Sequence, residues 1–128
     1  MGEGIPEHYV YGYIRTAERN DVEARRLRRE IGRFCEQQGL SLITVFCDQG
    51  CDGSEVSRPG FSAALDVLSI RFVSMSLVVP DMTHLTPKDD DVRETMLRLV
   101  QRAGSKVESI SQIQDEHQKL DANNGETK

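Results

Sequence analysis

Segments with the composition of strands alternate with segments that have the apolar spacing of helices, and this alternation constrains the fold more than any other feature. Runs of apolar, β-branched or aromatic residues predict four strands, at 9–15, 40–47, 75–79 and 106–110. Helices are predicted between them, because apolar residues recur there every three or four positions. Such alternation is typical of right-handed βαβ units. We therefore expect a doubly wound α/β fold, with a mainly parallel sheet and helices on both faces.

The segment after the first strand carries signals for both ends of a helix. Asn20 and Glu23 have the spacing of a capping box, in which each side chain accepts a hydrogen bond from the other residue's amide. Gly39 supplies the stop. Apolar spacing predicts a buried stripe made of Val22, Ala24, Leu27, Ile31, Phe34 and Cys35.

Other local signals place the elements that follow. The run 40–47 is almost continuously apolar, which predicts a parallel strand covered on both faces. The turn-rich segment 48–57 after it is expected to be the most mobile loop. Pro59 predicts the first turn of a second helix, and a third helix is expected to begin with Thr86 as its cap and Pro87 in its first turn.

The chain is expected to form one domain with short additions at its ends. Its 128 residues suffice for a core of its own, and no internal repeat or low-complexity linker divides them. The polar segment 111–128 has too few apolar residues to build a core, so we expect a flexible tail that passes from frayed helix into disorder. The predicted organisation is an N-terminal extension at 1–8, a domain at 9–110 and a tail at 111–128.

Composition excludes several classes of protein. Three cysteines are an odd set that argues against a secreted disulfide scaffold. No apolar run approaches the roughly 18 residues of a membrane span, and the N-terminus lacks the features of a signal peptide, so we expect a cytoplasmic protein without membrane contact. Cys47, Cys51 and the scattered histidines lack the paired spacing of zinc ligands, so we expect neither a metal nor a cofactor.

Charge gives a mixed indication about nucleic acids. The formal net charge of -5 opposes non-specific binding to DNA. Arginines nevertheless crowd the first predicted helix, interleaved with glutamates at spacings that permit helical ion pairs. A solvated helix face is the simpler interpretation, and a patch for nucleic acid or an acidic partner is the alternative. The arginines are Arg25, Arg26, Arg28, Arg29 and Arg33.

Several ordered motifs resemble the serine recombinases of the resolvase/invertase family. Tyr13 and Arg15 match the first strand of that family, where the pattern Tyr-x-Arg-x-Ser ends in the serine that attacks DNA, and Ala17 takes the place of the serine here. The turn after the second predicted strand is similar to the family's Asp-x-Gly-x-Ser-Gly, with Asp48 matching and Asp52 replacing the serine. The Arg-Pro-Gly signature that opens the second helix is present from Arg58 onward.

A third motif departs further from the family pattern. Family members carry a segment like Leu-Asp-Arg-Leu-x-Arg after the third strand. In the corresponding place Thr83 replaces the aspartate, while His84 and Pro87 replace the two arginines. Of the arginines that the resemblance implies around the scissile phosphate, Arg15 and Arg58 remain.

The resemblance implies a vestigial catalytic site. An alanine methyl group cannot attack a phosphodiester. Loss of one group that stabilises the charged transition state typically slows such a reaction by about 10²- to 10³-fold. A hydroxyl at position 16 is not expected to substitute, because strand alternation sends residues 15 and 16 to opposite faces. The vestigial site comprises Tyr13, Arg15, Ala17, Asp48, Asp52, Arg58, Thr83 and His84.

Three residues of that site admit specific structural interpretations. His84 is either a weak, pH-dependent phosphate ligand or, as the simpler interpretation, a partly exposed loop histidine. Arg15 and Arg58 are expected to pair with Asp48 or Asp52, since a buried guanidinium without a partner is costly.

These observations favour a catalytically inactive, recombinase-like domain that acts through protein contacts, as a homodimer or with another protein. The alternative is a DNA-binding or accessory component of DNA strand exchange, with weak DNA binding retained. A nucleotide-binding module is a third interpretation. It is disfavoured because residues 15–19 do not form a glycine-rich phosphate loop after the first strand.

Overall fold

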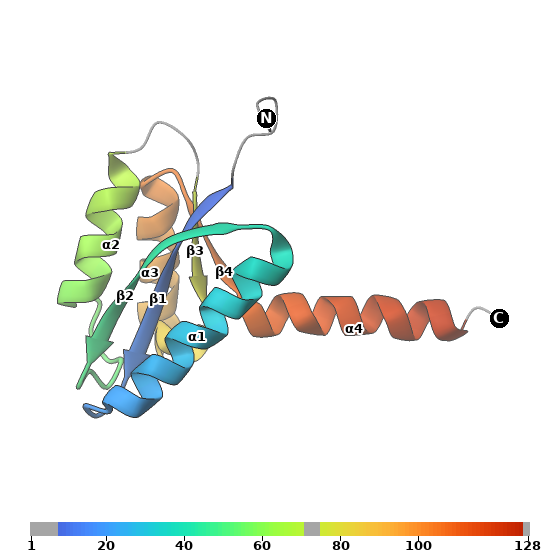
Figure 1. The fold of residues 1–128 in the computed structure, drawn as a ribbon. Helices are drawn as coiled ribbons and strands as arrows, with labels where there is room; N and C mark the ends of the chain where they lie inside the picture. Colours follow the sequence, from blue (N-terminus) through green and yellow to red (C-terminus); the bar gives the residue numbers. More distant parts are fainter. Residues whose placement is uncertain (1–7, 71–74, 127–128) are drawn as a thin grey trace.

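The computed structural model describes residues 8–70 and 75–126, and it contains one four-stranded parallel sheet (Figure 1). The strand order is β2-β1-β3-β4, and every neighbouring pair is parallel. This confirms the predicted α/β fold with a parallel sheet. The strands are β1 (Tyr9–Thr16), β2 (Ser41–Gln49), β3 (Ser76–Val79) and β4 (Lys106–Ser109).

Helices cover both faces of the sheet, as expected for a doubly wound fold. Side chains of β1 alternate between two cores, so that Tyr13 packs on the side of α2 and α3 while Ile14 packs on the side of α1. Both side chains are completely buried. The helices are α1 (Asp21–Gln38), α2 (Pro59–Ser69), α3 (Asp90–Arg102) and α4 (Ile110–Glu126), with one 3-10 turn, η1 (Met82–His84).

The ends of α1 lie where the sequence predicts them, although the capping box is only half formed. The Asn20 side chain accepts from the Glu23 amide at 3.0 Å, and Gly39 ends the helix in a left-handed conformation. The reciprocal bond is replaced, because the Asn20 amide donates to Gln49 at 2.6 Å. The carboxylate of Glu23 instead pairs with Arg26 along the helix surface.

The buried stripe of α1 is confirmed except at its first member. Val22 lies two positions before Ala24, which is off the three- and four-residue spacing of the stripe, and its exposed fraction is 71%. The remaining members are buried, and Ile31 is completely enclosed. The helix therefore contacts the sheet from Ala24 onward.

The prediction that the second strand is covered on both faces is wrong. Among the strands of the described residues, β2 lies at the edge of the sheet and pairs only with β1. Most of its residues are half-buried, and Ile43 is 42% exposed. An apolar run indicates a strand without indicating its place in the sheet, which is why the sequence pattern misleads here.

The third predicted helix begins later than expected. Asp89, and not Thr86, caps α3, because the Asp89 side chain accepts from the Val92 amide at 3.1 Å. Thr86 is buried and accepts from the Asp89 amide at 3.3 Å, so it supports the turn that precedes the helix. Thr86 and Asp89 are both residue types that favour caps.

The segment predicted as a tail is helical through most of its length. α4 begins directly after β4 and projects away from the rest of the domain (Figure 1). Its flexibility stays a prediction. Residues 1–7 of the expected N-terminal extension and 127–128 of the tail lie outside the described residues. Within the described ranges, no helix is long and apolar enough to cross a membrane.

The two ends of the α1 stripe provide a matched test of this packing. We expect Ile31→Ala to lower the free energy of unfolding by about 2–5 kcal/mol, because it leaves a cavity in a closed core. Val22→Ala should change it by less than about 0.5 kcal/mol, because its side chain is already solvated. Urea unfolding of both variants measures the difference, and equal losses would contradict this placement of α1.

Candidate functional site

The carboxyl ends of β1 and β2 meet the η1 turn and the start of α2 at one edge of the sheet. This is the edge at which parallel sheets bind their ligands. Tyr13 and Arg15 come from β1, Asp48 comes from β2, Arg58 immediately precedes α2, and His84 ends η1. The structure brings these five residues into one connected network of hydrogen bonds.

Asp48 connects both strands to the second helix. Its carboxylate accepts from the Tyr13 hydroxyl at 2.8 Å and from the amides of Gly60 and Phe61 at 2.7 and 2.9 Å. The two amides belong to the first turn of α2, where free N–H groups and the helix dipole favour a negative charge. Burial raises the pKa of Tyr13, against the opposite effect of its hydrogen bond from Arg58, so the phenol stays a donor.

Gly60 is required by this approach of strand and helix. A Cβ at this position would lie 2.7 Å from the backbone oxygen of Cys47 and 2.8 Å from the Asp48 carboxylate. Real Cβ atoms do not approach backbone atoms so closely. The glycine of the Arg-Pro-Gly signature therefore lets Asp48 reach the start of α2.

The Arg58 guanidinium is completely engaged by the protein. A guanidinium has five N–H donors, and all five have partners here. The side chain is also closed off, with only 2% of the residue exposed. Its acceptors are one phenol and four backbone carbonyls: the Tyr13 hydroxyl at 3.3 Å and the oxygens of Glu55 at 2.7 Å, Gly53 at 3.2 Å, His84 at 3.2 Å and Leu85.

Arg15 is held by backbone carbonyls as well, but through only two of its five N–H donors. Its terminal nitrogens donate to the backbone oxygens of Cys51 at 2.8 Å and Thr83 at 2.7 Å. Its Nε is buried and has no hydrogen-bond partner in the described structure. Burial and the nearby Arg58 charge lower the pKa of Arg15. Thr83 thus contributes its backbone to the site, while its side chain is directed to Asp81.

The expected pairing of the two arginines with acids is not observed. Among the described residues, neither Arg15 nor Arg58 forms an ion pair with Asp48 or Asp52. Asp52 is exposed and accepts from the Ser54 amide and hydroxyl, which hold the pKa of its carboxyl below the usual range. Backbone carbonyls satisfy the arginines instead, and no sequence pattern marks such acceptors.

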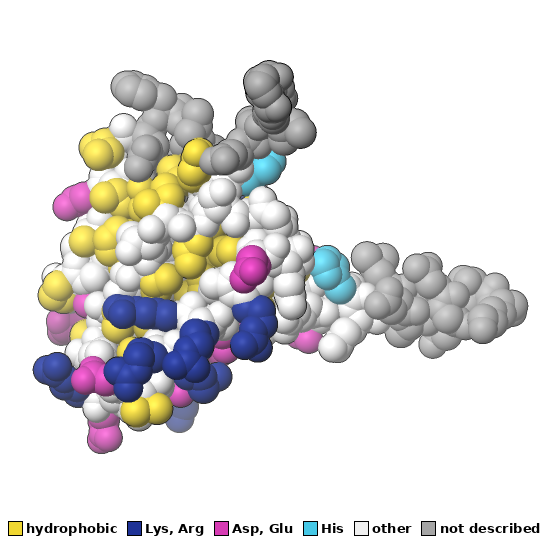
Figure 2. All heavy atoms as spheres, in the orientation of Figure 1, with side chains coloured by type: hydrophobic (Ala, Val, Ile, Leu, Met, Phe, Trp, Pro, Cys, Tyr) yellow, Lys and Arg dark blue, Asp and Glu magenta, His cyan; other side chains and the backbone are white. Residues whose placement is uncertain are grey.

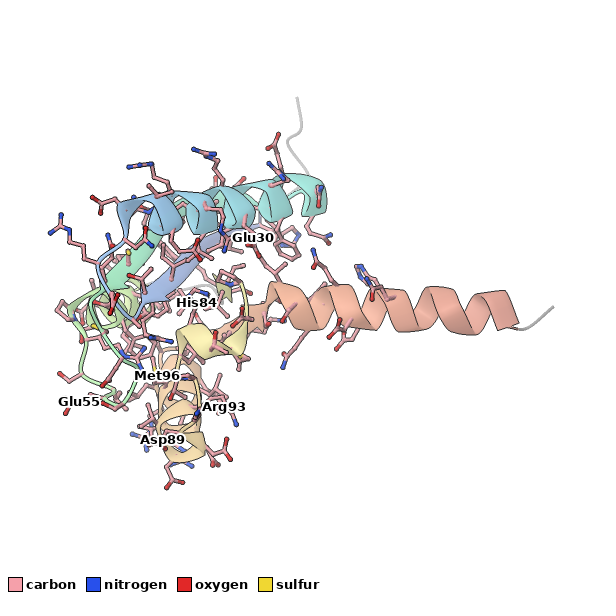
Figure 3. All side chains as sticks on the ribbon, turned by 90° about the horizontal axis from the view of Figure 1, so that it is seen from below. Glu30, Glu55, His84, Asp89, Arg93 and Met96 are labelled. Atoms are coloured by element: carbon pink, nitrogen blue, oxygen red, sulfur yellow. The ribbon has the colours of Figure 1, made fainter. Side chains whose placement is uncertain are left out.

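His84 is buried, which corrects the expectation of a partly exposed loop histidine. The residue is labelled in Figure 3. Its Nδ1 accepts from the Arg15 amide at 2.9 Å, so the neutral ring carries its proton on Nε2. Burial lowers the pKa of His84. A neutral ring with its Nδ1 occupied is a weak ligand for phosphate, and its role in this structure is to hold η1 against β1.

Ala17 is exposed just beyond the end of β1 and lines two hollows. One hollow, of about 380 Å³, lies against the loop that contains Asp52 and Arg58. The other, of about 440 Å³, lies against the start of α1 and His84. The neighbouring Thr16 is buried, and its hydroxyl has no partner among the described residues. Ala17 therefore borders the open space of the site without offering a reactive atom.

The described residues contain no group of three His, Cys, Asp or Glu side chains that could hold a metal ion. All three cysteines are free thiols. Burial raises the pKa of Cys35 and Cys47, which disfavours the reactive thiolate.

Comparison with known proteins agrees with this arrangement. The family model described as "Resolvase, N terminal domain" matches residues 10–125. The fold is similar to the C-terminal catalytic domain of ISC1926 TnpA, an IS607-like serine recombinase, with a TM-score of 0.67 and 18% identity over 80% of this chain and 70% of that chain. It is also similar to the N-terminal catalytic domain of TP901-1 integrase, with a TM-score of 0.69 and 16% identity over 81% and 79% of the two chains. No curated protein matches the chain.

Because Arg58 donates five hydrogen bonds, even a conservative substitution at this position should lower the stability of the protein. Arg58→Lys keeps the charge but supplies only three donors, so at least two buried acceptors lose their partner. We expect the free energy of unfolding to fall by about 1–3 kcal/mol. Arg98→Lys is the control. The Arg98 side chain is exposed, and it forms an ion pair with Glu94 on the helix surface at 3.6 Å, which a lysine can also form. Similar urea midpoints for the two variants would show that the Arg58 network contributes little.

His84 should make stability dependent on pH. In the unfolded chain its pKa returns toward the ordinary value of 6.5, whereas burial keeps the folded pKa lower. The unfolded state therefore binds more protons just below that value, so stability is lost as pH falls from about 6.5 toward the folded pKa. Urea unfolding between about pH 5 and pH 8 measures this loss.

His84→Asn is the matched variant for this experiment, because its side-chain oxygen can accept from the Arg15 amide without titrating. We expect the variant to lose less stability than the wild-type protein over the same acidic range. Parallel pH profiles would assign the dependence to other groups.

Proposed function

This chain belongs to the family of the resolvase N-terminal domain, and from that membership we propose that it is a catalytically inactive relative that acts through contacts with other proteins. It is a serine-recombinase-like domain related to DNA recombination. Its role is regulatory or self-assembling, and it does not cleave DNA.

The engagement of the two arginines is the observation that carries the proposal. Phosphodiester cleavage concentrates negative charge in the transition state, and donors aimed at that charge must be free to receive it. All five donors of Arg58 are occupied, and two of the five donors of Arg15 are held by carbonyls. A phosphate could gain the donors of Arg58 only by displacing their present acceptors, each of which would then lack a partner.

The residues around the arginines support the same conclusion. Ala17 corresponds to the position of the family's serine and supplies no nucleophile. The Thr16 hydroxyl is buried, so it does not replace the serine. An exposed carboxylate at Asp52 borders the same hollow as Ala17, and its negative charge opposes the approach of a phosphate.

The projection of α4 supports a role in protein contacts. The helix leaves the domain beyond its first turns (Figure 1), and its described residues from 114 to 118 are all exposed. Ile110 and Ile113 pack the first turn of α4 against the core, and a projecting helix without further packing is only marginally stable in water. Contact with a second copy or with another protein would bury part of it and stabilise it.

A DNA cleavage assay tests the loss of catalysis. We expect the wild-type chain to form no covalent adduct with supercoiled or nicked DNA, because no nucleophile is present. Ala17→Ser should also form none, because the donors of Arg58 remain occupied and the segment after β3 lacks the two arginines of the family's third motif. Gel separation with and without protease measures the adduct, and an active serine recombinase catalytic domain serves as the positive control.

Comparing the wild-type chain with Ala17→Ser separates the loss of the serine from the engagement of the arginines. A protease-sensitive adduct with the wild-type chain would overturn the assignment as inactive. An adduct with Ala17→Ser alone would show that the arginines remain competent and that only the serine is missing.

An accessory role on DNA is the alternative, favoured by the arginines exposed on α1. Arg25, Arg29 and Arg33 have no ion pair within the described part of the chain. A complex led by phosphate contacts weakens steeply as salt rises. Absence of binding in low salt, or binding that ignores salt, would dispose of this alternative.

A further inference from the structure

We propose that the groove between α1 and the start of α4 binds an acidic segment of a partner protein, one that carries two carboxylates around an apolar side chain. The inference rests on the proposed contact function and assigns it a surface. The groove encloses about 440 Å³ and shares no lining residue with the two hollows at Ala17. It is therefore a separate site.

Two arginines in the groove are available to a ligand. Arg29 and Arg33 line it and are exposed, and neither forms an ion pair with any described residue. They are four positions apart on α1, which places both guanidiniums on one face of the helix. Figure 2 shows Lys and Arg side chains gathered over α1. Guanidiniums in this arrangement can each bind one carboxylate through two parallel hydrogen bonds.

The third arginine of the groove is already used within α1. Arg26 pairs with Glu23 at 2.7 Å and with Glu30 at 3.5 Å. Glu30 also lines the groove, and Figure 3 shows it on the side of α1 that faces the domain. Its charge opposes a carboxylate near Arg26. The carboxylates of a ligand are thus directed toward Arg29 and Arg33, which fixes where the ligand lies along the groove.

The lining of the groove includes two apolar side chains beside Gln37 and Gln114. Phe34 of α1 and Ile110 at the start of α4 both line it and belong to the same core cluster. An apolar side chain placed between two carboxylates of a ligand would extend this cluster outward. Arginines around an aromatic centre form a combination that is enriched in protein interfaces.

The same features favour a peptide over a nucleic acid. The groove is concave, Phe34 and Ile110 are part of its lining, and Glu30 lies within it, whereas the backbone of duplex DNA presents only charged and polar groups. The net charge of -5 also opposes a long polyanion. A short acidic segment can bind the two free arginines while experiencing less repulsion from the net negative charge of the domain than a long polyanion does.

Selection from a random peptide display library, with the full chain as the immobilised target, tests the inference. We expect the enriched peptides to carry at least two acidic residues around an apolar one. Their affinity, measured by fluorescence anisotropy, should fall about tenfold or more for the double variant Arg29→Glu, Arg33→Glu. Peptides in which lysine replaces the acidic residues should bind that double variant better than the wild-type chain.

The double variant Arg25→Glu, Arg102→Glu is the matched control, because it changes charge equally at exposed arginines outside the groove. We expect it to bind the selected peptides as the wild-type chain does. Thermal unfolding by circular dichroism confirms that both double variants are folded.

Several outcomes would overturn the inference. These are a selection without enriched peptides, enriched peptides that lack acidic residues, and binding that the groove variant leaves unchanged. A double-stranded oligonucleotide that displaces the peptides and binds more tightly would assign the groove to nucleic acid. Peptides bound elsewhere would still agree with the proposed contact function, which the DNA cleavage assay tests independently.

Discussion

The Arg58 guanidinium joins segments that are far apart in the sequence, and the arrangement of the site depends on it. It connects β1 through the Tyr13 hydroxyl, the loop after β2 through Gly53, and the residues after η1 through Leu85. A buried positive charge is tolerated only when its donors are satisfied. Because Tyr13 in turn donates to Asp48, the network continues to the first turn of α2. Removing one member would leave several buried polar groups unpaired.

This network occupies every donor of Arg58 without a ligand, which supports the proposal that the site is inactive. A catalytic site keeps charged groups poised toward space that the substrate will fill. Here the open space beside Ala17 is bordered by a methyl group and the Asp52 carboxylate, while the positive charges point into the protein. The hydrogen bonds of the two arginines join segments of the domain, and under the proposed function the exposed surfaces of α1 and α4 are available for contacts with partners.

The fold was predictable where its signals are local. Asn20 and Gly39 mark the ends of α1 through bonds to residues within one turn. Position within the sheet is not a local property, so the apolar run of β2 did not indicate an edge strand. The burial of His84 was not predictable for the same reason. Its ring packs against a distant segment of the chain, where its Nδ1 accepts from the Arg15 amide. The sequence indicated which side chains gather at the site. It did not indicate the backbone carbonyls that the arginines bind, because every residue has a carbonyl and none is marked by its side chain.

The sequence distances spanned by the site have a consequence for folding. The bond between Arg15 and His84 joins residues 69 positions apart, and the bond between Arg58 and Tyr13 spans 45 positions. Long segments of chain must lose conformational entropy before such contacts can form and stabilise the fold. Parallel sheets fold slowly for this reason. We expect α1, whose bonds are local, to form early. The arginine network then closes late, as the step that commits the chain to its native topology.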